Sequence, residues 1–149
     1  MSLFGTLSVS ASALSAQRLR AAVVAENMAN SETTRTPEGG PYRRKQVIFE
    51  SQAQGSPFAS ELERASSQSL ASQIQGVVVR EVVNDPREAQ LRYQPGHPDA
   101  NGEGYVAFPQ VEPAEEMADL MSASRGYQSN VSAMVAVRDM INRSLDLLR

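Results

Sequence analysis

The residues of this sequence that are capable of chemistry are few and stand apart from one another. The single histidine, His97, lies in a Gly-His-Pro turn, and the sequence has no second histidine and no cysteine to complete a metal site. Three carboxylates, Glu115, Glu116 and Asp119, would suit a general base, but they fall in the first turns of an expected helix, where acidic side chains favour the helix dipole. We therefore expect no catalytic residue and no metal site, and the chain is not expected to be an enzyme.

Two further patterns favour a structural interpretation over a phosphate-binding site. The Gly-Glu-Gly sequence at 102–104 has no third glycine and no preceding dinucleotide-binding strand, so it is typical of a hairpin turn. The basic triplet at 43–45 would suit phosphate or an acidic partner, but solvated side chains at the start of a strand explain it more simply. We therefore expect no cofactor and no small-molecule substrate.

Composition and charge narrow the functional classes further. The chain has 149 residues, a formal net charge of -3 and no cysteine, which argues against nucleic-acid binding and excludes disulfides. Only 5% of the residues are aromatic and tryptophan is absent, so a large compact core is not expected. The N-terminal residues lack the basic start and the apolar run of a cleaved secretory signal, and no stretch approaches the roughly 20 apolar residues of a membrane span.

The elements expected at the two ends of the chain are long helices with apolar stripes. One helix is expected over 3–28 and the other from 112 to 149, and both repeat apolar residues at the spacing of a coiled-coil seam. The seam of the first helix comprises Leu7, Ala11, Leu14, Ala21, Ala25 and Met28. The seam of the second helix comprises Leu120, Ser124, Tyr127, Val131, Met134, Arg138, Ile141, Leu145 and Leu148. Since such stripes must be covered, the helices are expected to pack on each other, on neighbouring copies of the chain, or on both.

Polar residues interrupt these seams. Ser124 and Arg138 belong to the second seam, and Arg18 lies close to the first. Either the arginine stems lie along the seam with their charges in water, or the polar groups set the register by penalising misaligned pairings. The sequence leaves both interpretations open.

The middle of the chain has the pattern of a small β unit. Apolar and β-branched runs predict strands at 46–49, 77–83, 91–93 and 105–108. Residues 51–75 are rich in Ser, Gln and Ala and are expected to form a flexible loop. The predicted fold class is α+β, in which long N- and C-terminal helices pair as a coiled-coil-like bundle around a small β-rich middle domain. Its expected parts are an N-terminal helix and loop, a β-rich middle domain and a C-terminal helix, at 1–36, 37–111 and 112–149.

Several strings in the chain match known signatures in the same order. The string MSASRGYQSNV at 121–131 is similar to the C-terminal signature of the flagellar basal-body rod protein FlgC family, the proximal rod proteins of bacterial flagella. The segments 40–49 and 91–98 resemble the central segments of that family, and AENMAN at 25–30 resembles a signature shared by rod and hook proteins, in which an Asn-x-x-Asn pair ends the helix. The resemblance covers nearly the whole chain except the poorly matched 51–75 stretch. The positions that match the motifs are Asn27, Asn30, Ser124, Arg125, Tyr127 and Gln128.

The resemblance implies a structural subunit of the proximal rod, the drive shaft of the bacterial flagellar basal body. Proteins of this family are exported through the flagellar type III apparatus without a cleaved signal peptide and fold as they join the axial structure. Their terminal helices form the inner tube, the axial domain, which transmits torque and forms the wall of the export channel. The family's β-rich middle faces outward.

The resemblance also implies a location and a set of partners. The location is the periplasmic rod of the flagellar basal body. The partners are other copies of the chain, neighbouring rod proteins, and subunits of the MS ring and the export-gate adaptor, with no nucleic acid among them. The seams alone would equally suit a cytosolic helical coiled-coil adaptor protein, which would form a closed oligomer instead of continuing to further subunits.

Overall fold

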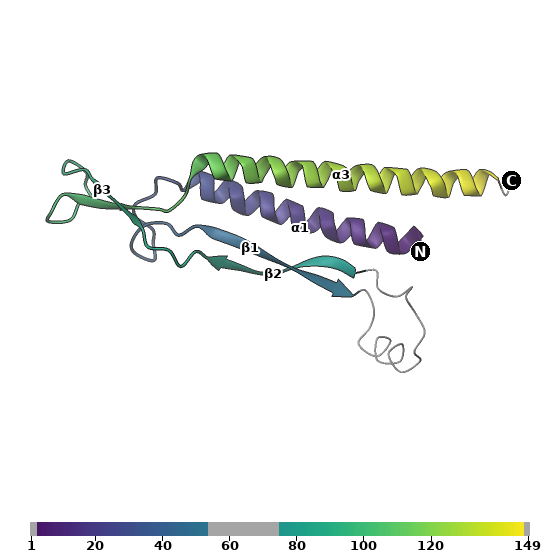
Figure 1. Cartoon of the computed structure of the whole chain (residues 1–149), viewed down its shortest axis with the longest axis horizontal. Coiled ribbons are helices and arrows are strands. Elements are labelled where there is room, and N and C mark those ends of the chain that lie inside the picture. The colour runs from purple at the N-terminus through teal and green to yellow at the C-terminus, as the bar shows by residue number, and fades with distance from the viewer. Residues whose placement is uncertain (1–2, 54–74, 148–149) are drawn as a thin grey trace, which may run out of the picture. The chain divides into compact units, whose positions relative to one another are not determined.

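The computed structural model describes residues 3–53 and 75–147, and within them it contains two long helices and two small sheets (Figure 1). The elements are, in chain order, α1 (Leu3–Ala29), β1 (Lys45–Ala53), β2 (Gln75–Asn84), β3 (Gln90–Tyr93), β4 (Tyr105–Phe108) and α3 (Pro113–Asp146). The sheets pair β1 with β2 and β3 with β4. The α+β fold class predicted from the sequence is confirmed.

The predicted flexible loop at 51–75 lies largely outside the described residues. At its edges the prediction is wrong, because residues 51–53 belong to β1 and Gln75 begins β2. Polar residues extend both strands since β1 and β2 pair through their backbones, and backbone hydrogen bonds do not depend on the side chains that the sequence pattern reads.

The end of α1 and the start of α3 lie where Asn30 and Pro113 predict them. Asn30 ends α1: its backbone N–H donates to the carbonyl oxygens of Glu26 and Asn27 at 3.1 and 3.2 Å, and its side-chain amide donates to Glu26 at 2.9 Å. Pro113 occupies the first position of α3, where its missing N–H costs no hydrogen bond. Within 3–53 and 75–147, neither helix has both the length and the apolar content needed to cross a bilayer.

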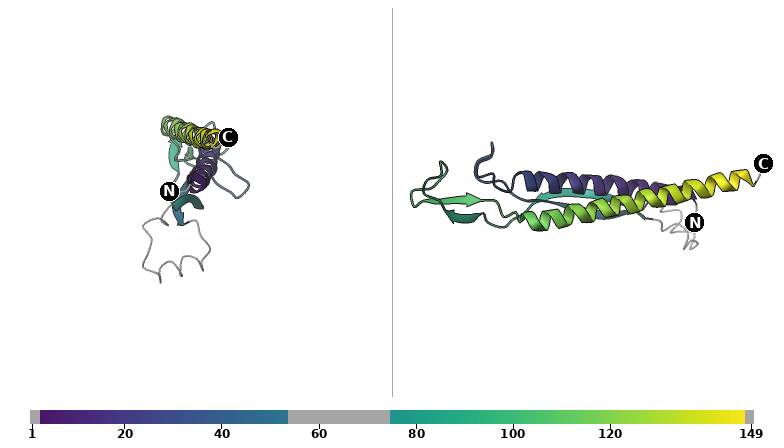
Figure 2. Two further views of the ribbon diagram at one scale, coloured as in Figure 1. Left: turned by 90° about the vertical axis from the view of Figure 1, so that its right-hand side faces the viewer. Right: turned by 90° about the horizontal axis from the view of Figure 1, so that it is seen from above.

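The chain divides into two compact units, each built from several segments. One unit comprises Leu19–Ile48 and Glu81–Ser124. In it, the C-terminal part of α1 and the N-terminal part of α3 lie side by side and antiparallel, as Figures 1 and 2 show, with Arg20 contacting Asp119 and Asn27 contacting Glu116. The buried apolar residues of this unit are Val23, Val24, Tyr42, Val106, Phe108, Val111 and Ala123.

The other unit comprises Met1–Arg18, Phe49–Arg80 and Arg125–Arg149. Its α1 segment contacts α3 through Gln17, which packs on Gly126: a Cβ atom added at this glycine would lie 3.3 Å from Cδ and Nε2 of Gln17. The same α1 segment contacts β2 through the hydroxyl of Ser12, which accepts a hydrogen bond from the N–H of Val77 at 3.1 Å. Helix α1 therefore contacts both a helix and a strand within this unit.

Strands β3 and β4 form an antiparallel pair with one covered face and one exposed face. Arg92 pairs with Val106 and Gln90 with Phe108 on the covered face, where Val106 and Phe108 are buried. The other face carries Leu91, Tyr93 and Tyr105, which are exposed, and Ala107, which is half-buried. Burial alternates along β4 only, since every residue of β3 is exposed, so the buried side of the pair is supplied by β4.

The connection from β3 to β4 is a turn built largely on Asn101 and Gly104. The side-chain oxygen of Asn101 accepts hydrogen bonds from the N–H groups of Glu103 and Tyr105 at 3.0 and 2.8 Å. Gly104 has a φ of +81°, and a Cβ atom there would lie 2.9 Å from the ring of Tyr93, so glycine is required. His97 lies in this connection, where its Nδ1 accepts a hydrogen bond from the N–H of Asp99 at 3.1 Å.

Candidate functional site

The most deeply buried polar side chains among the described residues meet where α1 ends. We call this group the polar cluster; it consists of the side chains of Asn27, Tyr42, Arg44 and Glu116 with the backbone of Lys45, whose own side chain is 36% exposed. Asn27 is 1% exposed and Glu116 is 0% exposed, so neither side chain reaches bulk solvent. Since a buried polar group is unfavourable unless it is hydrogen-bonded, these residues must be satisfied by the protein itself.

The side-chain amide of Asn27 uses its full capacity of four hydrogen bonds. Its oxygen accepts from the N–H of Lys45 and from the hydroxyl of Tyr42, both at 2.9 Å. Its nitrogen donates to the carbonyl oxygen of Lys45 at 2.9 Å and to Glu116 Oε2 at 3.1 Å. Because an amide offers two donor hydrogens and one oxygen that accepts twice, no bonding capacity is left over.

The buried carboxylate of Glu116 is neutralised by a residue from another part of the chain. Its Oε1 accepts from Nε of Arg44 at 2.5 Å, and the side chain of Arg44 is only 14% exposed. Arg44 also lies 3.8 Å from Asp119, which pairs with Arg20 of α1 at 2.9 Å. These linked ion pairs thus join α1, the segment before β1 and α3.

Tyr42 completes the cluster as a hydrogen-bond donor. Burial raises the pKa of the Tyr42 phenol to about 12, and the negative charges of Glu26 and Glu116 contribute in the same direction. The phenol therefore keeps its proton at neutral pH and donates it to Asn27. Glu26 also forms an ion pair with Lys45, at 2.5 Å.

A separate ion pair, between Asp85 and Arg87, lies where β2 ends and fixes the following turn. The carboxylate of Asp85 accepts from the backbone N–H of Arg87 at 3.0 Å and from its guanidinium at 2.8 Å. These bonds from Arg87 hold the pKa of Asp85 below its usual value. The N–H of Asp85 donates to the carbonyl oxygen of Arg44 at 2.7 Å, which links this turn to the polar cluster.

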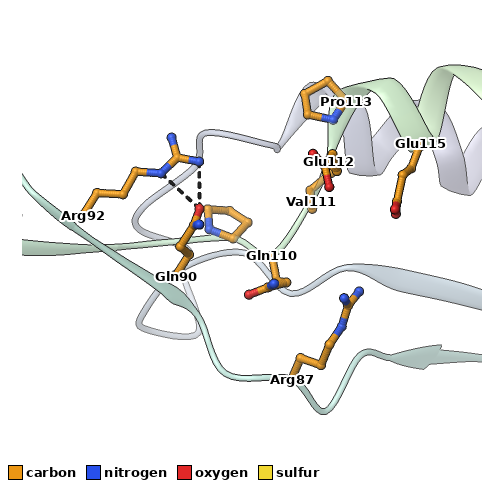
Figure 3. Close-up of a pocket in the computed structure, with 9 residues that line it drawn as sticks. Arg87, Gln90, Arg92, Gln110, Val111, Glu112, Pro113 and Glu115 are labelled. Atoms are coloured by element: carbon orange, nitrogen blue, oxygen red, sulfur yellow. Dashed lines mark hydrogen bonds between the residues drawn. The ribbon is translucent and has the colours of Figure 1, made fainter.

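The cavity drawn in Figure 3 has a volume of about 250 Å³ and lies beside the start of α3. Its basic groups are already engaged. Arg92 donates two hydrogen bonds to the side-chain oxygen of Gln90, at 3.1 and 2.9 Å, and its guanidinium lies 4.8 Å from the ring centre of Phe108, while Arg87 is held by Asp85. Glu112 and Glu115 line the cavity too, so its charges are mixed and select neither an anion nor a cation.

The structure places the predicted seam residues in different environments. Half-buried positions are Leu7, Leu14, Ala21, Met28, Leu120, Met134 and Ile141. Exposed positions are Ala11, Ala25, Ser124, Tyr127, Val131, Arg138 and Leu145, and Leu148 lies outside the described residues. Of the remaining residues that match the family motifs, Arg125 and Gln128 are exposed on α3.

The residues that α1 and α3 bury most deeply were not in the predicted seams. On α3 they are Glu116, Ala123 and Val137, and on α1 they include Ala16 and Val23. Their spacing is seven residues or a multiple of seven, as it is within the predicted seams. Since those seams also contain alanine and valine, periodicity alone did not distinguish the buried positions from their neighbours.

Two interpretations of charged residues need correction. Arg44 was expected to be a solvated residue at a strand entrance, but it pairs with Glu116 and is largely buried. Glu116 was explained as a partner of the helix dipole, yet its carboxylate is fully buried and is bonded to Asn27 and Arg44. Local sequence could not reveal this pairing because 72 residues separate Arg44 from Glu116.

Comparison with known proteins gives consistent matches over the whole chain. Residues 7–35 match the family model described as flagella basal body rod protein, and residues 103–147 match the model described as flagellar basal body rod FlgEFG protein C-terminal. The chain is 44% identical over 151 residues to flagellar basal-body rod protein FlgC of Bacillus subtilis, with 99% of each chain covered. It is 37% identical to FlgC of Borreliella burgdorferi over 158 residues, covering 100% of this chain and 99% of the relative. It is also 37% identical to FlgC of Escherichia coli O157:H7 over 147 residues, covering 99% and 98%.

Proposed function

Because this chain belongs to the family of flagellar basal-body rod protein FlgC, we propose how its structure serves the rod. The chain is a structural subunit of the proximal rod of the flagellar basal body and assembles with other rod components. This role requires protein surfaces that pack on neighbouring subunits.

We propose that the terminal segments 1–36 and 112–149 make these contacts. In this arrangement they form an axial domain that packs against the same segments of neighbouring subunits, while 37–111 forms a middle domain that faces outward. The packed helices transmit torque and form the wall of the export channel. Residues of the predicted seams that the single chain leaves exposed are the proposed subunit contacts.

One observation carries this proposal: α3 exposes large apolar side chains along one face. Val131, Val135 and Leu145 are 39%, 50% and 60% exposed, and Tyr127 lies on the same side of the helix. Large apolar side chains that recur on an exposed helix face commonly mark an interaction site. The occupant that we propose is a terminal helix of a neighbouring rod subunit, since relatives across the whole chain carry the name of a rod protein.

The same proposal includes how the protein is exported and which other proteins it contacts. We propose that it is exported without a cleaved signal peptide and acts in the periplasmic part of the basal body. Its proposed neighbours are other copies of the chain, adjacent rod proteins, and subunits of the MS ring and the export-gate adaptor. Since the exposed face of α3 is covered only on assembly, the ends of the helices should be frayed in the dilute monomer.

The test is to replace an exposed apolar residue of α3 with a charged one. Val131→Asp and Leu145→Asp should prevent incorporation into basal bodies and abolish swimming, because each places a carboxylate in the proposed contact. The matched control is Ala136→Asp, which makes the same kind of change at an exposed position outside this face. Incorporation is measured by immunoblot of isolated basal bodies, and folding by circular dichroism of each purified variant.

The control makes the outcomes separable. Loss of incorporation by Val131→Asp and Leu145→Asp, with Ala136→Asp incorporated and all three variants folded, supports the contact. Normal incorporation of Val131→Asp and Leu145→Asp would contradict it. A soluble closed oligomer with stable helix ends would favour the cytosolic adaptor instead.

A further inference from the structure

We propose that the polar cluster fixes the register in which α1 pairs with α3. Asn27 is its central residue, because its amide bonds both Lys45 and Glu116. The inference concerns the unit formed by Leu19–Ile48 and Glu81–Ser124 alone. It goes beyond the proposed function, because it stands or falls on the folded monomer whether or not the chain enters a rod.

The apolar side chains of this unit specify the register only weakly. Near the cluster α1 buries Val23 and Val24, and α3 buries Ala123 with Leu120 half-buried beside it. Ala123 follows Glu116 by seven residues, so a shift of one heptad brings the alanine to the place of the glutamate. Small aliphatic side chains that recur at heptad spacing pack comparably in more than one alignment, which is why coiled coils use a buried polar residue to select one.

The charge of Glu116 distinguishes the alignments that apolar packing does not. In the observed register its two carboxylate oxygens accept from Arg44 and Asn27. A shift of α3 by seven residues moves the carboxylate by about 10 Å along the helix and away from both donors. A buried carboxylate without a partner is strongly unfavourable, so the shifted alignments are penalised.

Asn27 also fixes the position of a third segment, the start of β1. Its amide holds the N–H and the carbonyl oxygen of Lys45, the first residue of β1, and Arg44 precedes Lys45 in the chain. Helix α1 therefore cannot slide past β1 without breaking both bonds. One amide thus aligns α1 with β1 and with α3, and this alignment decides which residues of α3 lie opposite which residues of α1.

The inference is tested by a distance measurement across the helix pair. The chain has no cysteine, so Ala22→Cys and Ala114→Cys, both at exposed positions of this unit, give two unique sites for nitroxide labels. Pulsed electron spin resonance on the doubly labelled full chain should give one narrow distance distribution. The same labels are then placed in the triple variant Asn27→Leu, Arg44→Met, Glu116→Leu, in which the hydrogen bonds that join Asn27, Arg44 and Glu116 are removed.

The triple variant is expected to remain helical by circular dichroism but to show a broadened distribution or a second peak, displaced by about 5 to 10 Å, the length of one turn to one heptad. A single narrow peak at the original distance would overturn the inference. Loss of helix in the triple variant would also count against it, because the cluster would then supply stability instead of register.

A second variant keeps the polar complementarity while exchanging its parts. Asn27→Asp combined with Glu116→Gln retains one carboxylate and one amide across the contact between α1 and α3, with the amide oxygen placed to accept from Arg44, and gives up only the bond to the carbonyl oxygen of Lys45. This variant is expected to keep the single narrow distance. A broadened distribution in a folded exchange variant would overturn the inference, because complementary polar groups would then be insufficient to set the register.

Discussion

The side chain of Asn27 pairs with the backbone of Lys45 as a neighbouring β-strand would. Its amide accepts from the N–H of Lys45 and donates to the carbonyl oxygen of the same residue, both at 2.9 Å. Helix α1 thus supplies a hydrogen-bond partner to the first residue of β1. The second donor hydrogen of the amide goes to Glu116, so the same group also holds α3.

Asn27→Asp should be among the most destabilising single substitutions in the chain. The new carboxylate cannot donate to Lys45, and it faces the carboxylate of Glu116 across a contact of 3.1 Å in the native protein. We expect a loss of about 3–5 kcal/mol in the free energy of unfolding, measured by urea denaturation. Asn30→Asp, the same change at the half-buried second asparagine of the motif, should cost less than about 1 kcal/mol. Equal losses at the two positions would contradict the role of the Asn27 amide.

Substituting Glu116 by alanine should destabilise the chain far more than substituting Glu115, although the two residues are adjacent in sequence. Glu116→Ala leaves Arg44 buried without its partner and should destabilise the chain by about 3–5 kcal/mol. Glu115→Ala removes an exposed carboxylate from the first turn of α3 and should cost about 0.3–1 kcal/mol. Thermal and urea unfolding of both variants measure the difference. A cost at Glu116 as small as that at Glu115 would mean that the dipole explanation is sufficient for both.

Tyr42 should make the chain sensitive to alkaline pH. Its pKa is raised to about 12 in the folded chain, against about 10 when unfolded, so the folded state binds the proton more tightly. The resulting stabilisation is complete below about pH 10 and is lost as the pH rises through about 12. Urea denaturation across this range should show a falling free energy of unfolding in the native chain and a shallower fall in Tyr42→Phe. Tyr93→Phe, at an exposed tyrosine, is the control and should keep the native slope. An unchanged slope in Tyr42→Phe would contradict this assignment.

Gly126 should tolerate no large side chain. A Cβ atom there lies only 3.3 Å from the side chain of Gln17, so the branched side chain of Gly126→Leu would force α1 and α3 apart locally. We expect a loss of about 1–3 kcal/mol in the free energy of unfolding, measured by urea denaturation. Ala136→Leu, at an exposed position of α3, should stay within about 0.5 kcal/mol of the native chain. A Gly126→Leu variant as stable as the native chain would show that the two helices do not need a glycine at this contact.

Much of the fold followed from local sequence. The expected helix at 3–28 corresponds to α1 at Leu3–Ala29, and the strands at 91–93 and 105–108 correspond closely to β3 and β4. Helical and strand periodicity, with Pro113 at the start of α3, is sufficient for such elements because the signals lie within each segment. The strands β1 and β2 came out longer than predicted, since their ends are held by backbone pairing.

The packing of the helices did not follow from the same signals. Periodicity located apolar residues on α3 but could not distinguish the positions that are buried, such as Ala123 and Val137, from those that are exposed, such as Val131 and Leu145. The polar cluster was missed for a different reason: its residues come from segments far apart in sequence, and Glu116 and Arg44 are recognisable as partners only once folded. The role of Val131 and Leu145 in subunit contacts stays a prediction.

The most direct test of the rod assignment is cryo-electron microscopy of basal bodies isolated from the source cells. We predict that this chain can be traced in the proximal rod, with α1 and α3 packed against the terminal helices of neighbouring subunits and with Val131 and Leu145 inside those contacts. Intact rods in which no density fits this chain, or in which the exposed face of α3 meets no neighbour, would contradict the account.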